Sequence, residues 1–168
     1  MKKLITLLFT GLTALLTACS SYSDTSVLPV EIYNHTSKAI NFNMTDATKK
    51  DWKGWELGYG GGGYEVAAYN STSGSGWRVP DNWDPNYTIF FQWAGNNEIY
   101  TNPKRAFVKL PKYKDEEKIY LAIHFFPNDN IKAFVTNLTP DYPEYPYGWP
   151  QDDDPKRKKK IGKRHAAE

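Results

Sequence analysis

Short stretches in which apolar and polar residues alternate recur along the chain between Val30 and Val135. An alternation with a period of two is typical of β-strands that bury one face. The apolar positions of these stretches are Val30 to Tyr33; Ile40, Phe42 and Met44; Tyr64, Val66 and Ala68; Tyr87, Ile89, Phe91 and Trp93; Ala106, Val108 and Leu110; Ile119, Leu121, Ile123 and Phe125; and Ile131, Ala133 and Val135. No window shows the i, i+3, i+4, i+7 repeat of a helix. The pattern predicts a mainly β protein, an antiparallel two-layer β-sandwich of about seven short strands over residues 27–139.

Two details of the strand pattern predict local topology. The turn residues Asn34 to Ser37 separate the first two stretches, which favours a hairpin between them. The stretch from Tyr120 to Phe126 is apolar on both faces apart from His124. Such a strand is expected at the centre of a sheet that is covered on both sides.

Residues 46–63 and 70–86 do not alternate, and we expect them to form long aromatic and glycine-rich loops. They hold five of the aromatic residues, which favour protein interfaces because they bury a large area with few rotatable bonds: Trp52, Trp55, Tyr59, Trp77 and Trp83. These residues are our candidate partner-binding residues. Two other interpretations stay open, in which they stack on sugars or form a satellite core beneath the loops.

The glycine run from Gly60 to Gly63 is not followed by the Gly-Lys-Ser/Thr of a phosphate-binding loop, and the residues after it return to strand character. We therefore expect the glycines to permit a sharp bend or a bulge. Residues 140–150 alternate proline with aromatic residues, which favours an extended polyproline II segment. Residues 151–168 are rich in lysine, and we expect a disordered basic tail, either solvated or in contact with anionic lipid.

The first residues have the features of an export signal. Lys2 and Lys3 precede a short apolar run, and the sequence Leu16-Thr17-Ala18-Cys19 is similar to the bacterial lipobox. We expect a lipoprotein signal peptide over residues 1–18, covalent lipid on Cys19, and a lipidated tether over residues 19–26. An ordinary secretory signal with a buried thiol is the alternative. Ser20 resembles the residue that sorts enterobacterial lipoproteins to the outer membrane, with the domain facing the periplasm of a Gram-negative bacterium.

Charge and composition narrow the possible functions. Removing residues 1–18 leaves 19 basic and 19 acidic residues, and residues 19–150 alone carry a net charge of −3. A nucleic-acid-binding domain needs a basic face, so we expect no nucleic-acid partner. The three histidines, His35, His124 and His165, have no convincing catalytic or metal-ligating partner in the sequence. We expect neither an enzyme, nor a metal site, nor any cofactor besides the lipid on Cys19.

The order of several short motifs is similar to that of one bacterial lipoprotein family. After the lipobox come Val30 to Thr36 with the sequence VEIYNHT, then Gly58-Tyr59 and the glycine run, then Pro80 to Pro85 with the sequence PDNWDP, and finally Gln92-Trp93. This order resembles the lipoproteins of domain of unknown function 3304, over roughly Val30 to Trp93. A paired cysteine often follows the glycine run in that family, whereas Ala67-Ala68 occupies the region here, so no role of those thiols carries over.

The resemblance implies an immunity lipoprotein of the type VI secretion system. Such a protein would bind a cognate toxin effector, a lipase, and block its active site or its access to membrane lipid. Two rival functions remain open, a module that binds cell-envelope glycan through its aromatic residues and a structural lipoprotein of an envelope assembly.

Overall fold

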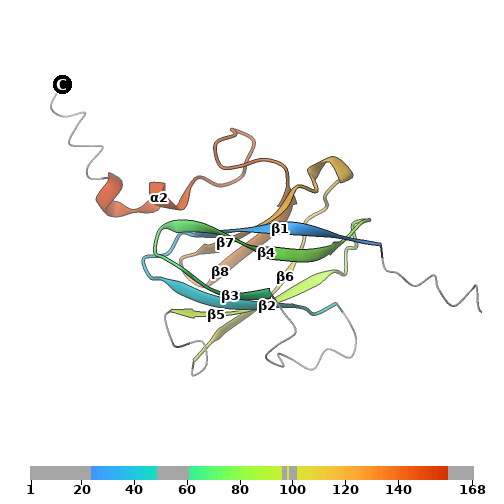
Figure 1. Ribbon diagram of the computed structural model, residues 1–168. Coiled ribbons are helices and arrows are strands. Elements are labelled where there is room, and N and C mark those ends of the chain that lie inside the picture. Colours follow the sequence, from blue (N-terminus) through green and yellow to red (C-terminus); the bar gives the residue numbers. More distant parts are fainter. Residues whose placement is uncertain (1–23, 49–60, 96–97, 99–101, 159–168) are drawn as a thin grey trace, which may run out of the picture.

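The computed structural model describes residues 24–48, 61–95, 98 and 102–158 (Figure 1). These residues form two four-stranded sheets packed face to face, so the predicted mainly β sandwich is confirmed. The strands are β1 (Thr25–Asn34), β2 (Ile40–Asp46), β3 (Gly61–Val66), β4 (Asn70–Pro80), β5 (Thr88–Gly95), β6 (Lys104–Lys109), β7 (Tyr120–Phe126) and β8 (Asn130–Thr136). The 3-10 helix η3 (Asp115–Glu117) and the short helix α2 (Pro150–Asp153) lie outside the sheets. Within the described ranges, no helix is long and apolar enough to cross a membrane.

The strand order is β4-β1-β7-β8 in one sheet and β3-β2-β5-β6 in the other. All neighbouring strands are antiparallel except β1 and β7, which run parallel. The predicted hairpin between β1 and β2 is therefore wrong, since the two strands belong to different sheets.

The side chain of Asn34 explains this crossing from one sheet to the other. Its Nδ2 lies 2.8 Å from the carbonyl oxygen of Lys38 and 3.0 Å from those of Val66 and Ala67. Its Oδ1 accepts hydrogen bonds from the backbone N–H and the hydroxyl of Thr36. A fully buried amide must find such partners, and it finds them only where the chain turns the corner between the sheets.

The core between the sheets is built from the alternating apolar positions that the sequence pattern identified. The central members are almost completely shielded from solvent: Val30, Ile32, Phe42, Met44, Ile89, Phe91, Leu121, Ile123 and Phe125. The period of two therefore predicts correctly which face of each of these strands is inward.

β4 lies where the sequence predicts a loop over residues 70–86. The strand is rich in serine and glycine, and it pairs along its length with β1. A Cβ atom at Gly74 would lie 3.2 Å from Cδ1 of Ile32, and one at Gly76 would lie 2.5 Å from Cγ1 of Val27. A larger residue at either position would have to displace these β1 side chains, which glycine avoids. Pairing with β1 overrides the weak strand propensity of the segment.

The glycine run also belongs to a strand, because Gly61 to Gly63 form the first half of β3. Asn41 of β2 pairs with Glu65, whereas Asn43 pairs with Gly62, so β3 has one more residue than β2 between these pairs. This is a β-bulge. It confirms the expectation of a bulge at the glycine run.

Residues 139–153 fold back over the outer face of the sheet that contains β1, β7 and β8 (Figure 1). The expected extended polyproline II segment is wrong, since consecutive turns close with hydrogen bonds from Tyr142 N to Thr139 O and from Tyr145 N to Tyr142 O. The expected disorder is wrong for residues 151–158, which include most of α2. Every residue of β7 except Phe126 is buried, as predicted for a strand covered on both sides.

The sandwich has two distinct ends, which we name after one residue at each. At the Thr25 end, β1 begins opposite Pro80, and β2 finishes at Asp46. The segment from residue 49 to residue 60 leaves and rejoins the described part at this end, because Gly61 pairs with Met44 near the end of β2. At the Lys38 end, the chain turns the corner from β1 into β2.

Candidate functional site

The structure places only two of the six candidate site residues. Cys19, Trp52, Trp55 and Tyr59 lie outside the described residues. Trp77 and Trp83 were expected in one aromatic loop, but Trp77 belongs to β4 and Trp83 follows it.

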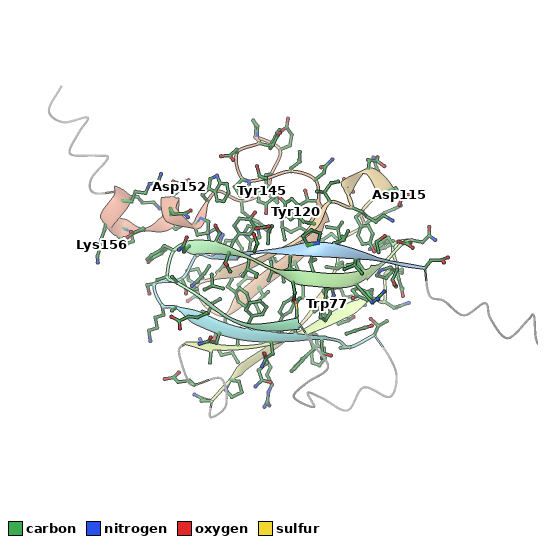
Figure 2. All side chains as sticks on the ribbon, in the orientation of Figure 1. Trp77, Asp115, Tyr120, Tyr145, Asp152 and Lys156 are labelled. Atoms are coloured by element: carbon green, nitrogen blue, oxygen red, sulfur yellow. The ribbon has the colours of Figure 1, made fainter. Side chains whose placement is uncertain are left out.

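Trp77 is a core residue, with 8% of its surface exposed (Figure 2). Its indole Nε1 donates to the hydroxyl of Tyr87 at 2.9 Å, and this hydroxyl donates to the carbonyl oxygen of Arg78 at 2.6 Å. Burial raises the pKa of Tyr87, which keeps the hydroxyl protonated as a donor. The expectation that Trp77 lies on a binding loop is wrong because its side chain fills the space between the sheets.

Trp83 lies in the loop between β4 and β5, at the Thr25 end. Its ring is partly buried against the core, and its Nε1 donates to the carbonyl oxygen of Leu110 at 3.1 Å. The ammonium of Lys112 lies 6.0 Å from the centre of the ring. Trp83 is thus anchored along one edge while part of its surface stays accessible, as an interface aromatic residue requires.

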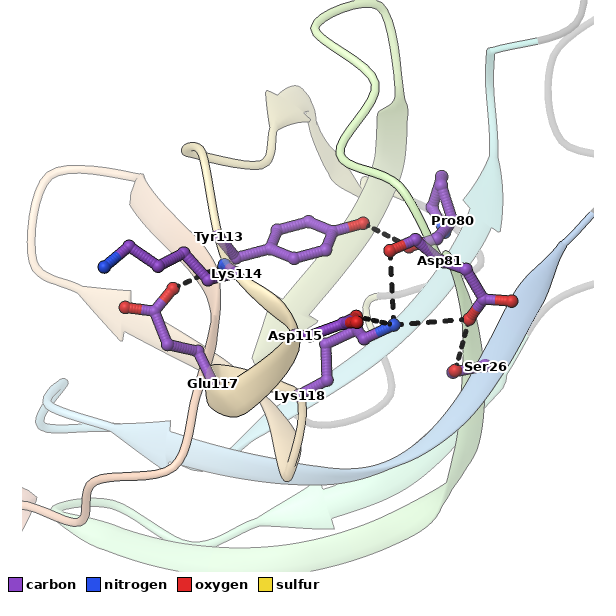
Figure 3. A network of polar contacts seen from close by, with 8 residues as sticks. All are labelled: Ser26, Pro80, Asp81, Tyr113, Lys114, Asp115, Glu117 and Lys118. Carbon is purple, nitrogen blue, oxygen red and sulfur yellow. Dashed lines mark hydrogen bonds and ion pairs between the residues drawn. The ribbon is translucent and has the colours of Figure 1, made fainter.

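A polar network holds the Thr25 end together (Figure 3). Nζ of Lys118 lies 2.6 Å from a carboxylate oxygen of Asp115 and 3.4 Å from one of Asp81. The hydroxyl of Ser26 donates to the same Asp81 oxygen, and this bond is the main reason that the pKa of Asp81 is low, with Lys118 contributing further. The hydroxyl of Tyr113 donates to the carbonyl oxygen of Pro80 at 2.6 Å. These contacts tie the start of β1, the end of β4 and η3 into one unit.

A second polar group lies beneath the segment 139–153 and was not expected from the sequence. Nδ1 of His35 lies 2.7 Å from Oδ2 of Asp153, and Nε2 of His35 lies 2.9 Å from Nδ1 of His124. Nε2 of His124 lies 2.7 Å from the hydroxyl of Tyr145. His124 has no exposed surface, and only 3% of His35 is exposed. Both histidines therefore have buried hydrogen-bond partners that the sequence alone does not reveal.

The direction of the hydrogen bonds follows from the acceptor at one end. The Asp153 carboxylate can only accept, so His35 donates from Nδ1 and, when neutral, accepts at Nε2. His124 then donates from Nδ1 and accepts at Nε2 from the hydroxyl of Tyr145. Burial lowers the pKa of His35 despite the nearby Asp153. Burial, together with the positive charge that His35 carries when it is protonated, lowers the pKa of His124 to about 3. Both rings are thus neutral at neutral pH, as this pattern requires.

Aromatic rings enclose the buried histidines. The ring of His124 stacks on Tyr33 with 4.4 Å between centroids, and His35 stacks on Phe126 at the same distance. Tyr145 belongs to the segment 139–153, and its side chain, which is 6% exposed, lies against the sheet (Figure 2). A catalytic acid or base must come within hydrogen-bond reach of its substrate, and these rings block such an approach. In this structure the Asp153–His35–His124–Tyr145 chain anchors the segment 139–153 to the sheet.

No signal in the sequence alone identifies this chain of residues. His35 and His124 are 89 positions apart and meet because β1 and β7 pair in parallel, a pairing that period-two alternation does not reveal. In the part of the chain that the structure describes, no three His, Cys, Asp or Glu side chains form a group that could hold a metal ion.

The Lys38 end carries a pocket with a volume of about 320 Å³. Its lining includes the aromatic residues Tyr69, Trp93 and Phe126 and the cations Lys38 and Lys104. Nζ of Lys104 is paired with a carboxylate oxygen of Asp129, 2.5 Å away. The pocket combines apolar walls with a charged rim.

The fold and these contacts define a β-sandwich protein in which a C-terminal segment is fastened over one sheet by a buried polar chain. The protein belongs to the family described as "Protein of unknown function (DUF3304)", whose model matches residues 33–133. The match extends beyond the region of resemblance in the sequence and covers all strands except most of β1 and the end of β8. No curated protein and no solved structure matches the chain.

Proposed function

We propose that this protein is a lipid-anchored immunity protein that faces the periplasm and neutralises a phospholipase effector of the type VI secretion system. In this proposal the lipid on Cys19 holds the protein in a membrane, and that membrane is the outer membrane of a Gram-negative bacterium. It acts by binding the effector and blocking access to lipid.

The observation that carries this proposal is the short distance along the chain between Cys19 and the first strand. Six residue steps separate Cys19 from Thr25, and a fully extended chain of that length reaches roughly 20 Å. A lipid on Cys19 therefore keeps the Thr25 end close to the bilayer. A phospholipase must approach the same surface to reach its substrate.

Trp83, an aromatic residue that supports a role in binding, lies at the Thr25 end. Trp83 lies in the β4–β5 loop there, and the segment that contains Trp52, Trp55 and Tyr59 departs from and returns to this end. Anchoring the effector and the inhibitor at one surface raises their effective concentration, so a modest contact area suffices for neutralisation.

The experiment uses the full-length lipoprotein in detergent or vesicles together with the phospholipase encoded by the adjacent gene. We expect tight binding with one-to-one stoichiometry and loss of phospholipid hydrolysis. Trp83→Ala should weaken binding about tenfold or more, as is typical of an interface tryptophan. Tyr142→Ala, which changes an exposed aromatic residue on the segment 139–153, is the control and should bind as the wild type does. Absence of binding by the wild type would refute the proposal.

The pocket at the Lys38 end favours envelope glycan binding as a second candidate function. Its aromatic walls include Trp93, whose fluorescence would report a sugar stacked nearby. A saturable fluorescence change with peptidoglycan fragments, absent in a Lys38→Ala or Tyr69→Ala variant, would support this alternative. Without such a change this second candidate fails.

A further inference from the structure

Among the described residues, β4 lies at the edge of its sheet, and β1 is the only strand that is hydrogen-bonded to it. The backbone N–H of His35 donates to the carbonyl oxygen of Phe125 in β7 at 2.9 Å. Because the backbone groups of successive strand residues point to opposite sides, the odd-numbered residues near the end of β1 face β7. The even-numbered residues Val30 and Ile32 therefore face β4.

This alternation shows which backbone groups of β4 are used by the sheet. Val30 pairs with Gly74 and Ile32 pairs with Thr72, so Gly74 and Thr72 bond to β1. The residues between and beside them, Ser71 and Ser73, direct their N–H and C=O groups away from the sheet. The N–H of Ser71 agrees with this assignment, because it donates to the side chain of the preceding Asn70 at 2.9 Å.

The open part of the edge is short and has clear limits. A register shift between β1 and β4 lies at Ser75 and Gly76. Beyond it, the carbonyl oxygen of Arg78 accepts a hydrogen bond from the hydroxyl of Tyr87, so that stretch of the edge is occupied. The open stretch runs from Ser71 to Ser75, and Ser73 and Ser75 are exposed.

The open stretch lacks charged residues and proline, two of the features by which proteins discourage strand addition, and the register shift at Ser75 and Gly76 lies only at its end. Charged residues and proline at an edge oppose pairing with another chain. The edge strand β6 carries Lys104, Arg105 and Lys109, whereas the stretch from Ser71 to Ser75 contains only serine, threonine and glycine. Its small side chains leave the backbone accessible to a second strand.

We infer that this edge of β4 binds an extended segment of the effector, which adds to the sheet as a fifth strand beside Ser71 to Ser75. The inference rests on the proposed function and specifies one contact through which the partner is held. Main-chain hydrogen bonds to the carbonyl oxygen of Ser71 and to the N–H and carbonyl oxygen of Ser73 supply the affinity, as in other cases of strand addition. The hydroxyl of Ser73 already donates to the Glu31 carboxylate at 2.8 and 2.9 Å, which fixes this side chain on the sheet face and leaves its backbone free to pair.

The test replaces Ser73 with proline in the full-length lipoprotein and measures binding to the phospholipase encoded by the adjacent gene. Proline removes the outward N–H without removing a bond to β1, and an edge strand tolerates it at such a position. We expect Ser73→Pro to bind about 100-fold more weakly, since it loses a hydrogen bond, leaves a partner carbonyl unpaired and disturbs the neighbouring pairs. Ser73→Ala, which keeps the N–H, should bind within a fewfold of the wild type.

Lys109→Pro is the control at the opposite edge. The Ala47 N–H donates to Thr88 O, so Thr88 faces β2, and its β6 partner Lys109 directs its backbone outward. This variant should bind as the wild type does. Hydrogen exchange provides a second measurement should Ser73→Pro not fold, because the amides of residues 71–75 should exchange more slowly in the wild-type complex than in the free protein.

The outcomes separate the two proposals. Wild-type protein that does not bind the phospholipase overturns the proposed function and this inference with it. Wild-type binding that survives Ser73→Pro, or that leaves the exchange of residues 71–75 unchanged, overturns the inference alone. A wild-type protein that dimerises by itself, and a Ser73→Pro variant that stays monomeric, would also overturn it, because a second copy would then occupy the edge.

Discussion

The hydroxyl of Tyr145 offers a direct test of the buried polar chain. It donates to Nε2 of His124 across 2.7 Å, and His124 has no exposed surface. Tyr145→Phe keeps the packed ring but leaves this nitrogen as a buried acceptor without its donor. Such a loss costs about 1–3 kcal/mol. For a protein of this length, a change of 2 kcal/mol lowers the unfolding temperature by roughly 4–8 °C.

The assay is equilibrium unfolding in urea, followed by intrinsic fluorescence, together with a thermal scan. Tyr142→Phe is the matched control, because this tyrosine lies on the same segment and is 53% exposed. The control should unfold within about 0.5 kcal/mol of the wild type. Equal stability of Tyr145→Phe and Tyr142→Phe would refute the assignment of Tyr145 as the donor that closes the chain. Proteolysis within residues 139–153 should accelerate in Tyr145→Phe before the sandwich itself unfolds.

The remaining predictions concern acidity, the Thr25 end and the anchor. Below the ordinary histidine pKa of 6.5, the unfolded chain binds a proton that His124, with a folded pKa of about 3, excludes. The free energy of unfolding should therefore fall by about 1.4 kcal/mol for each pH unit below 6.5, down to pH 3. Urea unfolding at several pH values between 6.5 and 5 measures this fall, and the free energy of unfolding of His124→Gln should depend less steeply on pH. An equal pH dependence in the variant and the wild type would contradict this account. At the Thr25 end, Ser26→Ala and Lys118→Met should each raise the pKa of Asp81, because the Ser26 hydroxyl and the Lys118 ammonium both stabilise its carboxylate. NMR titration of the carboxyl carbon measures both shifts, and an unchanged pKa in Ser26→Ala would count against the assignment. Cys19→Ala should move the protein from the membrane fraction to the soluble fraction, and retention at the membrane would exclude a lipid anchor on this residue.

The fold was predictable where alternation and burial coincide. In β2, β5 and β7 the residues at every second position fill the core, such as Phe42, Phe91 and Ile123. The alternation pattern did not predict β4, because the first seven residues of this strand contain no large apolar side chain. Its strand conformation depends on pairing with β1, whose Val27 and Ile32 side chains lie close to Gly76 and Gly74. Strand preference of this kind depends on the partner strand more than on the strand's own residues.

The C-terminal segment shows the limit of local reasoning. Alternating proline and aromatic residues favour an extended conformation when only neighbouring residues are considered. The outer face of β7, however, presents Tyr120, Ala122 and His124, which need cover. Burial of an aromatic side chain contributes about 1.5–3 kcal/mol, and Tyr145, Tyr147 and Trp149 all pack against this face. Their burial outweighs the local preference and folds the segment back.

The anchor and the two proposed contacts together place the partner relative to the bilayer. Ser73 pairs with Glu31, six strand residues beyond Thr25, or roughly 20 Å along the sheet. Trp83 lies at the Thr25 end, nearer the lipid that we propose on Cys19. A partner that touches both must therefore extend along the side of the sandwich, with one part beside the membrane surface and another up to roughly 40 Å away when the tether is extended. A phospholipase held along this line is kept at the bilayer while its approach to lipid is blocked, which is the arrangement that an anchored inhibitor needs.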